Sequence, residues 1–152
     1  MSDYKTANAN WHTINIGGVT LIGDLPSDHL SLFIEDDTLG IRTGVAIGPV
    51  SIAIDVLPGE PRPEGQGDWE DIAETSVEAS DPMTISGPWD DHPAHALDLA
   101  PGPWRLRVNA RGRETAYDEA VESATETYLL QLWRAEIGPT LPLKSTTRDL
   151  TD

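Results

Sequence analysis

Three apolar-alternating runs decide the fold of this chain: Ala96-Leu-Asp-Leu-Ala100, Pro103-Trp-Arg-Leu-Arg-Val-Asn-Ala-Arg111 and Glu126-Thr-Tyr-Leu-Leu-Gln-Leu-Trp133. In the second run, apolar side chains from Trp104 to Ala110 alternate with Arg105, Arg107 and Asn109. A period of two places the two sets on opposite faces of a strand, so the run predicts a half-buried strand. The third run predicts another strand over Thr127 to Arg134, and the acidic, alanine-rich stretch between them predicts a mobile loop.

The rest of the chain reads as further short strands joined by turns. Gly17-Gly18 and Gly48-Pro49 each separate two β-branched runs, which predicts two hairpins about these pairs. Met83 to Trp89 alternates as well and predicts a strand. Trp69 to Ala79 matches a helical face and a strand equally, so periodicity leaves both open.

Together these patterns predict an all-β fold, a single-domain antiparallel β-sandwich with long loops. We expect a flexible N-terminus at 1–10, the sandwich domain at 11–134, and an extended or disordered tail at 135–152. The predicted core residues are the following: Ile52, Ile54, Val56, Val77, Ile85, Leu97, Leu99, Trp104, Leu106, Val108, Leu130 and Leu132.

Charge narrows the class of partner. The 152 residues carry 26 acidic and 10 basic side chains, a formal net charge of −16, and residues 1–104 alone carry 18 acidic and three basic ones, or −15. Such a surface repels nucleic acid and anionic membranes and attracts basic proteins. Two readings stay open: a directed negative face, or a compositional bias that serves solubility.

The chain contains no cysteine, and its first residues do not have the pattern expected of a targeting segment. The absence of cysteine excludes disulfides and thiolate sites, and the N-terminus has neither a basic nor an apolar leader region. We therefore expect a cytoplasmic protein, a monomer or weak homodimer.

No catalytic or cofactor motif is apparent. Ser27-Asp28-His29 lacks a nucleophile elbow, and the double glycine at 17–18 lacks the Lys and Ser/Thr of a phosphate loop. Asp90-Asp91-His92-Pro93-Ala94-His95 is the sharpest polar group, and it could ligate a divalent metal in a metal-dependent hydrolase. Its histidines are three apart and interrupted by proline, so a solvated loop is favoured. We predict no catalytic, cofactor or metal site.

Two rows of charged residues and five tryptophans are the remaining candidates for a binding site. A basic stripe formed by Arg105, Arg107, Arg111 and Arg113 could hold an anion, but cross-strand pairing with acids such as Asp55, Glu74 or Glu78 is favoured. On the strand reading, Glu70, Glu74 and Glu78 share an exposed face, and we predict them as contacts to a protein partner. The tryptophans are interpreted as core and sheet-edge residues rather than a sugar-binding platform.

Three segments carry a resemblance: Trp69-Glu-Asp-Ile-Ala-Glu-Thr-Ser-Val77, Leu97-Asp-Leu-Ala-Pro-Gly-Pro-Trp-Arg-Leu-Arg-Val-Asn-Ala-Arg-Gly-Arg113 and Thr127-Tyr-Leu-Leu-Gln-Leu-Trp133. Over Ile41 to Trp133 the chain resembles a group of short β-sandwich proteins frequent in actinobacteria, and more distantly the competence proteins that inhibit the DNA-entry nuclease. The resemblance implies a strand at Trp69 to Ala79 and a nuclease as the kind of partner.

The leading hypothesis is a non-enzymatic acidic binding protein, an inhibitor or immunity protein for a basic partner such as a nuclease or toxin. The alternatives are the metal-dependent hydrolase above and a structural or accessory domain whose charge only keeps it soluble.

Overall fold

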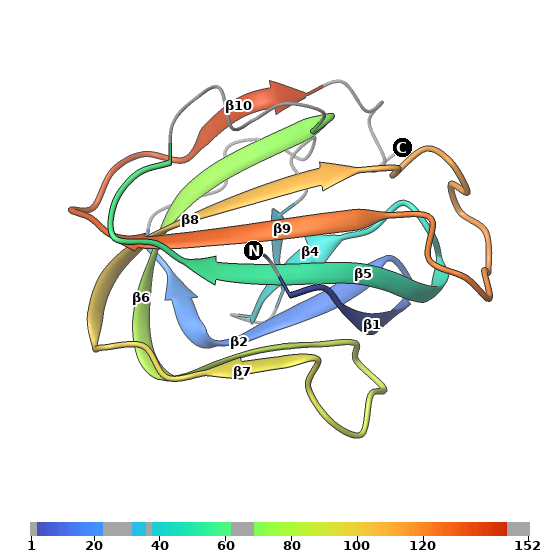
Figure 1. The fold of residues 1–152 in the computed structure, drawn as a ribbon, viewed down its shortest axis with the longest axis horizontal. Helices are drawn as coiled ribbons and strands as arrows, with labels where there is room; N and C mark the ends of the chain where they lie inside the picture. Colours follow the sequence, from blue (N-terminus) through green and yellow to red (C-terminus); the bar gives the residue numbers. More distant parts are fainter. Residues whose placement is uncertain (1–2, 23–31, 36–37, 62–68, 146–152) are drawn as a thin grey trace.

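The computed structural model describes residues 3–22, 32–35, 38–61 and 69–145, and within these ranges the chain forms strands and turns without a helix (Figure 1). Among these residues, accordingly, no helix has the length and apolar character that a membrane crossing requires. The strands are β1 (Lys5–Asn10), β2 (Thr13–Leu21), β3 (Leu32–Glu35), β4 (Thr38–Arg42), β5 (Ile47–Val56), β6 (Asp71–Ser86), β7 (His95–Leu97), β8 (Gly102–Arg111), β9 (Thr127–Arg134) and β10 (Leu141–Ser145).

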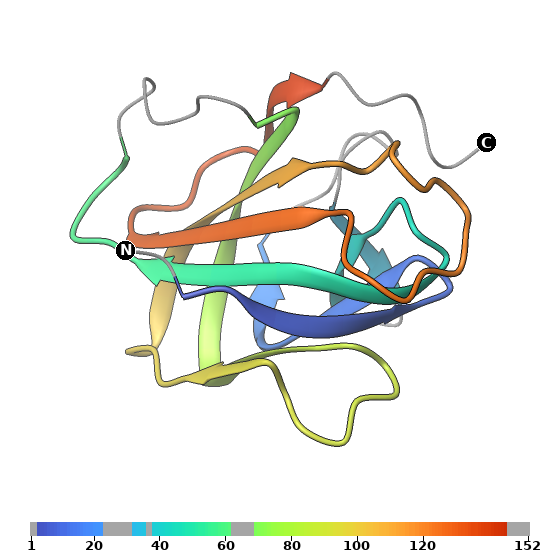
Figure 2. The ribbon, with the colours of Figure 1, turned by 45° about the vertical axis from the view of Figure 1, so that its right-hand side comes forward.

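Six of these strands close into a ring. The pairing runs β6–β8–β9–β5–β1–β2, and β2 pairs again with β6, which gives a closed barrel. Figure 2 shows β1 lying beside β5 along one side of this ring. Strands β10 and β7 add to β6, while β4 and β3 extend from β2. The all-β prediction is confirmed, and the more specific prediction of a β-sandwich is not.

Between the strands that the structure describes, all pairings are antiparallel except that of β5 with β9, which is parallel from Ser51 beside Thr127 to Val56 beside Leu132. The strands predicted over Trp104–Ala110 and Thr127–Arg134 are β8 and β9, and they are neighbours. The ambiguous stretch Trp69–Ala79 is resolved as strand, because Asp71–Ala79 pairs with β8 throughout.

Both predicted hairpins are wrong. Gly17 and Gly18 lie inside β2, where the register against β6 shifts between Gly17 and Val19, so the glycines form a bulge and not a turn. Gly48 and Pro49 lie inside β5, paired with β1. Glycine is needed at 48 because its φ is +138° and a Cβ there would lie 2.4 Å from the carbonyl oxygen of Val121.

Two segments expected to lie outside the domain contain strands. Lys5–Asn10, in the predicted flexible N-terminus, is β1, and it pairs with β5 over its whole length. Leu141–Ser145, in the predicted tail, is β10 and pairs with the start of β6. Alanines at 7 and 9 are the core residues of β1. Their short side chains give little hydrophobic signal in the sequence, which explains why β1 was missed.

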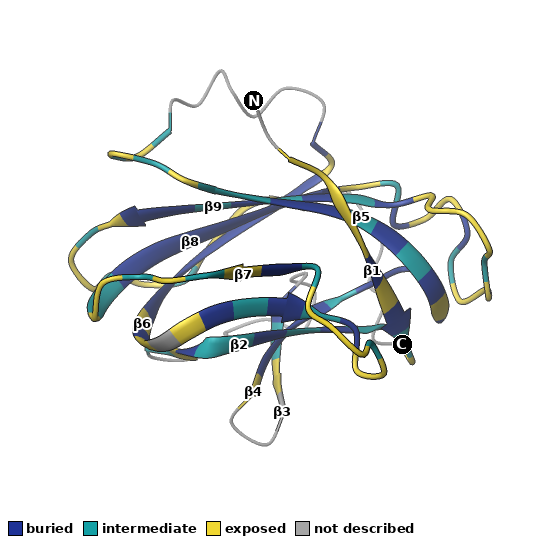
Figure 3. Ribbon diagram, turned by 60° about the horizontal axis from the view of Figure 1, so that its bottom comes forward, coloured by how far each residue is buried: buried dark blue, intermediate teal, exposed yellow. Residues whose placement is uncertain are grey.

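The barrel interior holds the core, and most of the predicted core residues lie in it. Ile54, Leu97 and Leu99 are partly buried against it, whereas Val56 at the end of β5 is 51% exposed, contrary to prediction. Strands β6 and β8 are buried on both faces over much of their length, as the dark segments in Figure 3 show. The outward-facing Arg105 and Arg107 are therefore buried as well.

Candidate protein-binding site

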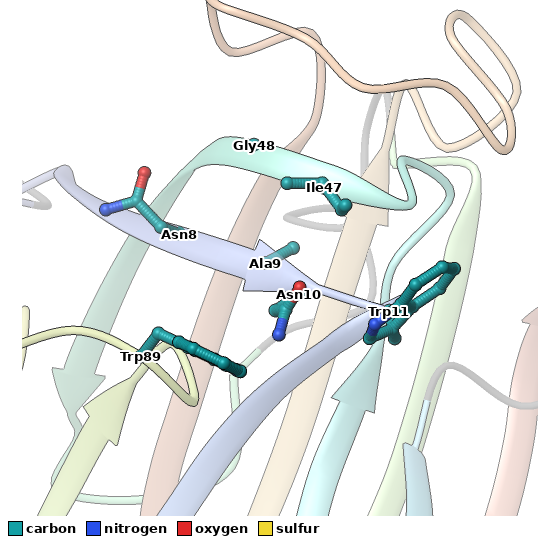
Figure 4. A pocket seen from close by; sticks show the side chains of 7 residues that line it. All are labelled: Asn8, Ala9, Asn10, Trp11, Ile47, Gly48 and Trp89. Carbon is teal, nitrogen blue, oxygen red and sulfur yellow. The ribbon is translucent and has the colours of Figure 1, made fainter.

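A surface pocket of about 390 Å³ lies at the end of β1, with an exposed indole ring on each side (Figure 4). Trp11 comes from the turn between β1 and β2 and is 74% exposed, while Trp89 comes from the loop after β6 and is 83% exposed. Asn10 lies between the two rings in this view. The remaining lining residues are Asn8, Ala9, Ile47 and Gly48. Exposed tryptophans are uncommon on a surface that contacts only water, and they are enriched where proteins bind each other.

The loop that carries Trp89 is fastened to β1. The Asp90 carboxylate accepts hydrogen bonds from the backbone N–H of Asn8 (3.1 Å), the Asn8 side-chain amide (2.8 Å) and the backbone N–H of Gly87 (2.8 Å). A Cβ at Gly87 would lie only 1.8 Å from the Asn8 carbonyl oxygen, so glycine permits this close approach. Partial burial acts to raise the pKa of Asp90, but the three hydrogen bonds outweigh it and hold the pKa below its usual value.

Trp11 is held in place by a tight turn. Trp11 and His12 are the two loop residues between the paired residues Asn10 and Thr13, with φ values of 49° and 64°. Two positive φ values are typical of a type I′ hairpin turn, a conformation that non-glycine residues adopt reluctantly. His12 is anchored on both sides, since its Nδ1 lies 2.7 Å from the Thr43 carbonyl oxygen and its Nε2 2.9 Å from Asp118 Oδ1.

An acidic segment borders the pocket beside Ile47. The backbone N–H of Val121 donates to the Ile47 carbonyl (2.9 Å), and that of Ala46 donates to the Glu119 carbonyl (2.9 Å). These bonds bring residues 118–122 next to β5. The loops that adjoin the pocket carry four exposed acidic residues, which we name its acidic rim: Asp91, two positions after Trp89, and Asp118, Glu119 and Glu122 in the segment beside Ile47.

A buried polar network fixes the loops beneath this rim. The Glu126 carboxylate accepts hydrogen bonds from the backbone N–H groups of Gly44 (2.9 Å) and Val45 (2.6 Å) and from the Tyr128 hydroxyl. Nearby, the Arg113 guanidinium donates to Asp71 (3.3 Å) and to a backbone carbonyl at position 42 (2.8 Å). The network ties residues 43–45 to the start of β9.

The ionisation of this network is shifted by its burial. Burial raises the pKa of Glu126 in spite of its hydrogen bonds. Burial, followed by the negative charge of Glu126, raises the pKa of Tyr128 well above its usual value. Both pKa shifts favour the neutral forms of these two buried side chains.

The three glutamates predicted as protein contacts do not form one exposed row. Glu70 and Glu78 are exposed, and Glu70 accepts a hydrogen bond from the Gly112 N–H (2.6 Å). Glu74 is only 4% exposed, because its carboxylate binds Arg105 Nε (2.5 Å) and Arg107 Nη2 (2.8 Å). The predicted pairing of the basic stripe with Glu74 is thus present.

Arg105 also joins β8 to the segment before β10. Its guanidinium donates to the Gly138 carbonyl (3.1 Å) and to the Ser76 hydroxyl (3.0 Å), which itself bonds Gly138. Residues of the predicted tail therefore cover the outer face of β6, which explains why a glutamate at an outward position is buried.

The structure separates the residues of the Asp90–His95 loop. Asp90 binds Asn8 and Gly87, whereas His95 is buried with its Nε2 2.8 Å from the Ile52 carbonyl oxygen. Asp91 and His92 are exposed. Across the described ranges, no three His, Asp or Glu side chains gather as metal ligands would. The triad-like Ser27-Asp28-His29 lies outside the described residues.

Sequence reasoning missed the tryptophan pocket, since Trp11 and Trp89 were interpreted as packing residues. Trp69, Trp104 and Trp133 are indeed buried. A signal for Trp89 was present: it follows Gly87-Pro88 and precedes Asp90-Asp91, so turn residues surround it. The type I′ turn at Trp11 has no such glycine signal.

No protein-family model matches the chain, and no curated protein matches it in sequence. Its fold is similar to that of ComJ from Bacillus subtilis, an inhibitor of the DNA-degrading activity of NucA. That structure is 11% identical, has a TM-score of 0.53, and the match covers 89% of this chain and 99% of ComJ. The product of crocagin biosynthetic gene J is also similar, with 13% identity, a TM-score of 0.50, and coverage of 90% and 99%. At these identities the likeness shows a shared fold, and it supports the distant resemblance inferred from the sequence motifs.

Proposed function

We propose that this chain is a binding protein without a catalytic role, which inhibits a basic protein partner such as a nuclease. The observation that carries the proposal is the pocket between Trp11 and Trp89 with its acidic rim. An apolar centre of aromatic side chains surrounded by charged groups is the usual anatomy of a protein interface. The fold shared with an inhibitor of a DNA-degrading enzyme supports the same function, as does the net charge of −16.

An acidic inhibitor suits a nuclease for an electrostatic reason. A nuclease groove that holds phosphates must be positively charged, so an acidic surface is attracted to it and can occupy it. Attraction between exposed charges is screened by salt, whose Debye length falls from about 10 Å at 0.1 M to about 3 Å at 1 M. Association should therefore slow as salt rises.

The test has two steps. The immobilised chain is used to capture proteins from the source lysate at 0.1 M and 1 M salt, and each captured protein is purified and assayed for DNA degradation with and without the chain. We expect the chain to capture a basic protein, and to capture more of it at about 0.1 M than at about 1 M salt. The DNA-degrading activity of that protein should fall stoichiometrically as the chain is added. Capture of acidic proteins alone, or a captured nuclease that the chain does not inhibit, would contradict the proposal.

Glu70 and Glu78 are secondary candidates for the partner surface. They lie eight positions apart on an extended segment, or about 26 Å at 3.3 Å per residue, so they would meet different parts of a partner. Substitution of Glu78 by Gln should slow association if it faces the partner. Equal association rates for the variant and the parent chain at 0.1 M salt would remove Glu78 from the surface.

A further inference from the structure

The chain repeatedly places an arginine over a tryptophan ring. The guanidinium carbon lies 5.2 Å from the ring centre for Arg107 over Trp133, and 4.8 Å for Arg111 over Trp69. A third pair, formed by residues 134 and 104, has a separation of 5.2 Å. These distances lie within the range of cation–π attraction. Three of the five tryptophans are thus each covered by an arginine of the same chain.

Trp11 and Trp89 are the two tryptophans without such a partner in the described ranges. No lysine or arginine lines their pocket either, and both rings are more than 70% exposed. The faces of these two rings are therefore open to a cation from another molecule, in contrast with the three rings that carry an arginine. The exposed acids at 91, 118, 119 and 122 lie in the loops that adjoin Trp89 and Ile47, and they add negative charge to this part of the surface.

We infer that the pocket binds an arginine side chain of the partner, with its guanidinium group against Trp11 or Trp89. The inference rests on the proposed function, and it specifies the chemistry of the contact. Arginine fits better than lysine, since its planar group stacks on an aromatic face and is more weakly hydrated. The side-chain amide of Asn10, between the rings, can accept a hydrogen bond from the guanidinium (Figure 4).

The volume of the site leaves room for an arginine side chain. About 390 Å³ lies near the lower end of the range for ligand pockets, roughly 300–1,000 Å³. Ile47 and Ala9 supply an apolar floor for the methylene stem of arginine, which prefers to lie along apolar surface.

A matched pair of peptides tests the inference without requiring the natural partner. One is an acetylated, amidated peptide of alternating glycine and arginine; the other replaces each arginine with citrulline, which has nearly the same shape and no charge. Binding is followed by NMR of the indole N–H signals. We expect the arginine peptide to shift the Trp11 and Trp89 signals in a saturable way, and the citrulline peptide to bind at least tenfold more weakly.

Substitutions then locate the site. Trp11→Ala and Trp89→Ala should each lower the affinity for the arginine peptide by about 3- to 30-fold, which corresponds to the usual strength of a cation–π contact. Ile137→Ala is the matched control, since Ile137 is an exposed apolar residue (63%) that does not line the pocket. Equal binding of the two peptides, or an unaltered affinity of both tryptophan variants, would overturn the inference. Saturable shifts of the same indoles by neutral oligosaccharides, with none from the arginine peptide, would overturn it in favour of a sugar site.

The same variants separate this inference from the proposed function. If a captured nuclease is inhibited equally well by the Trp11→Ala/Trp89→Ala double variant, the arginine contact is wrong and the inhibitor function stands. If the arginine peptide binds at the pocket and no basic partner is inhibited, the contact stands and the inhibitor function is wrong.

Discussion

Replacing Glu74 with glutamine should destabilise the fold by about 3–5 kcal/mol, the usual cost of removing one member of a buried ion pair. The side chains of Glu74, Arg105 and Arg107 are each only 6% exposed, so water cannot replace the missing carboxylate. A small domain is stable by only about 5–15 kcal/mol in total. The Glu74→Gln substitution should therefore remove a large fraction of the free energy of unfolding.

The two arginines should not contribute equally to this loss. In the Glu74→Gln variant, Arg105 still donates to the neutral oxygens of Ser76 and Gly138. Among the described residues, Arg107 keeps only its contact with the Trp133 ring. Arg107→Met leaves a one-to-one ion pair between Glu74 and Arg105 and adds apolar surface beside Trp133. We therefore expect Arg107→Met to cost less than Glu74→Gln.

Urea unfolding followed by tryptophan fluorescence measures these differences, provided the slope of the transition is unchanged. Glu78→Gln is the matched control, because Glu78 is exposed on the same strand and its substitution should alter the stability by less than about 0.5 kcal/mol. A Glu74→Gln variant within about 1 kcal/mol of the parent chain, or an Arg107→Met variant that costs more than Glu74→Gln, would refute the reasoning.

Two further predictions concern the loops around the pocket. Because burial raises the pKa of Glu126 above the ordinary 4.5, the folded protein keeps a proton that the unfolded chain releases, so stability should fall as pH rises from 4.5 through the raised pKa. Thermal unfolding across this window should show a weaker fall for Glu126→Gln, and equal slopes would contradict the assignment. Gly87→Ala should push the Trp89 loop away from Asn8, shift the Trp89 indole signal in NMR spectra and weaken binding of the arginine peptide. Gly59→Ala, where nothing lies within 4 Å of the added carbon, should do neither; an unshifted signal in Gly87→Ala would show that the contact with Asn8 is not required.

The strands with strong alternation were predictable from sequence, because a strand that buries one face has an apolar residue at every second position. This holds for β8 and β9, whose inward residues are large and apolar. It fails for β1, whose inward residues are alanines, and for the Gly17-Gly18 bulge, because two adjacent glycines are also the usual sign of a turn. The parallel pairing of β5 with β9 joins residues 76 positions apart, and no local pattern encodes it.

The candidate site was harder to predict for a related reason. Alternation correctly placed Glu74 on the outer face of its strand, but only the packed chain shows that this face is covered by Arg105 and residues near Gly138. Tryptophan is an ordinary core residue, so its identity does not distinguish the buried Trp104 from the exposed Trp89. Exposure depends on the docking of the loop onto β1, through Asp90 and Gly87.

The position of β9 in the ring has a consequence for the order in which the protein can fold. β9 lies between β5 and β8, yet it is the last ring strand to be synthesised. A nascent chain that ends before residue 127 has every other ring strand but leaves the interior open along one side. Closing the ring then requires the pairing of β9 with β5 across half the length of the chain, and contacts between such distant residues slow folding to roughly milliseconds to seconds in comparable β proteins. During synthesis, the half-built barrel therefore exposes apolar surface until Arg134 leaves the ribosome, and this interval is when the chain is most prone to aggregate.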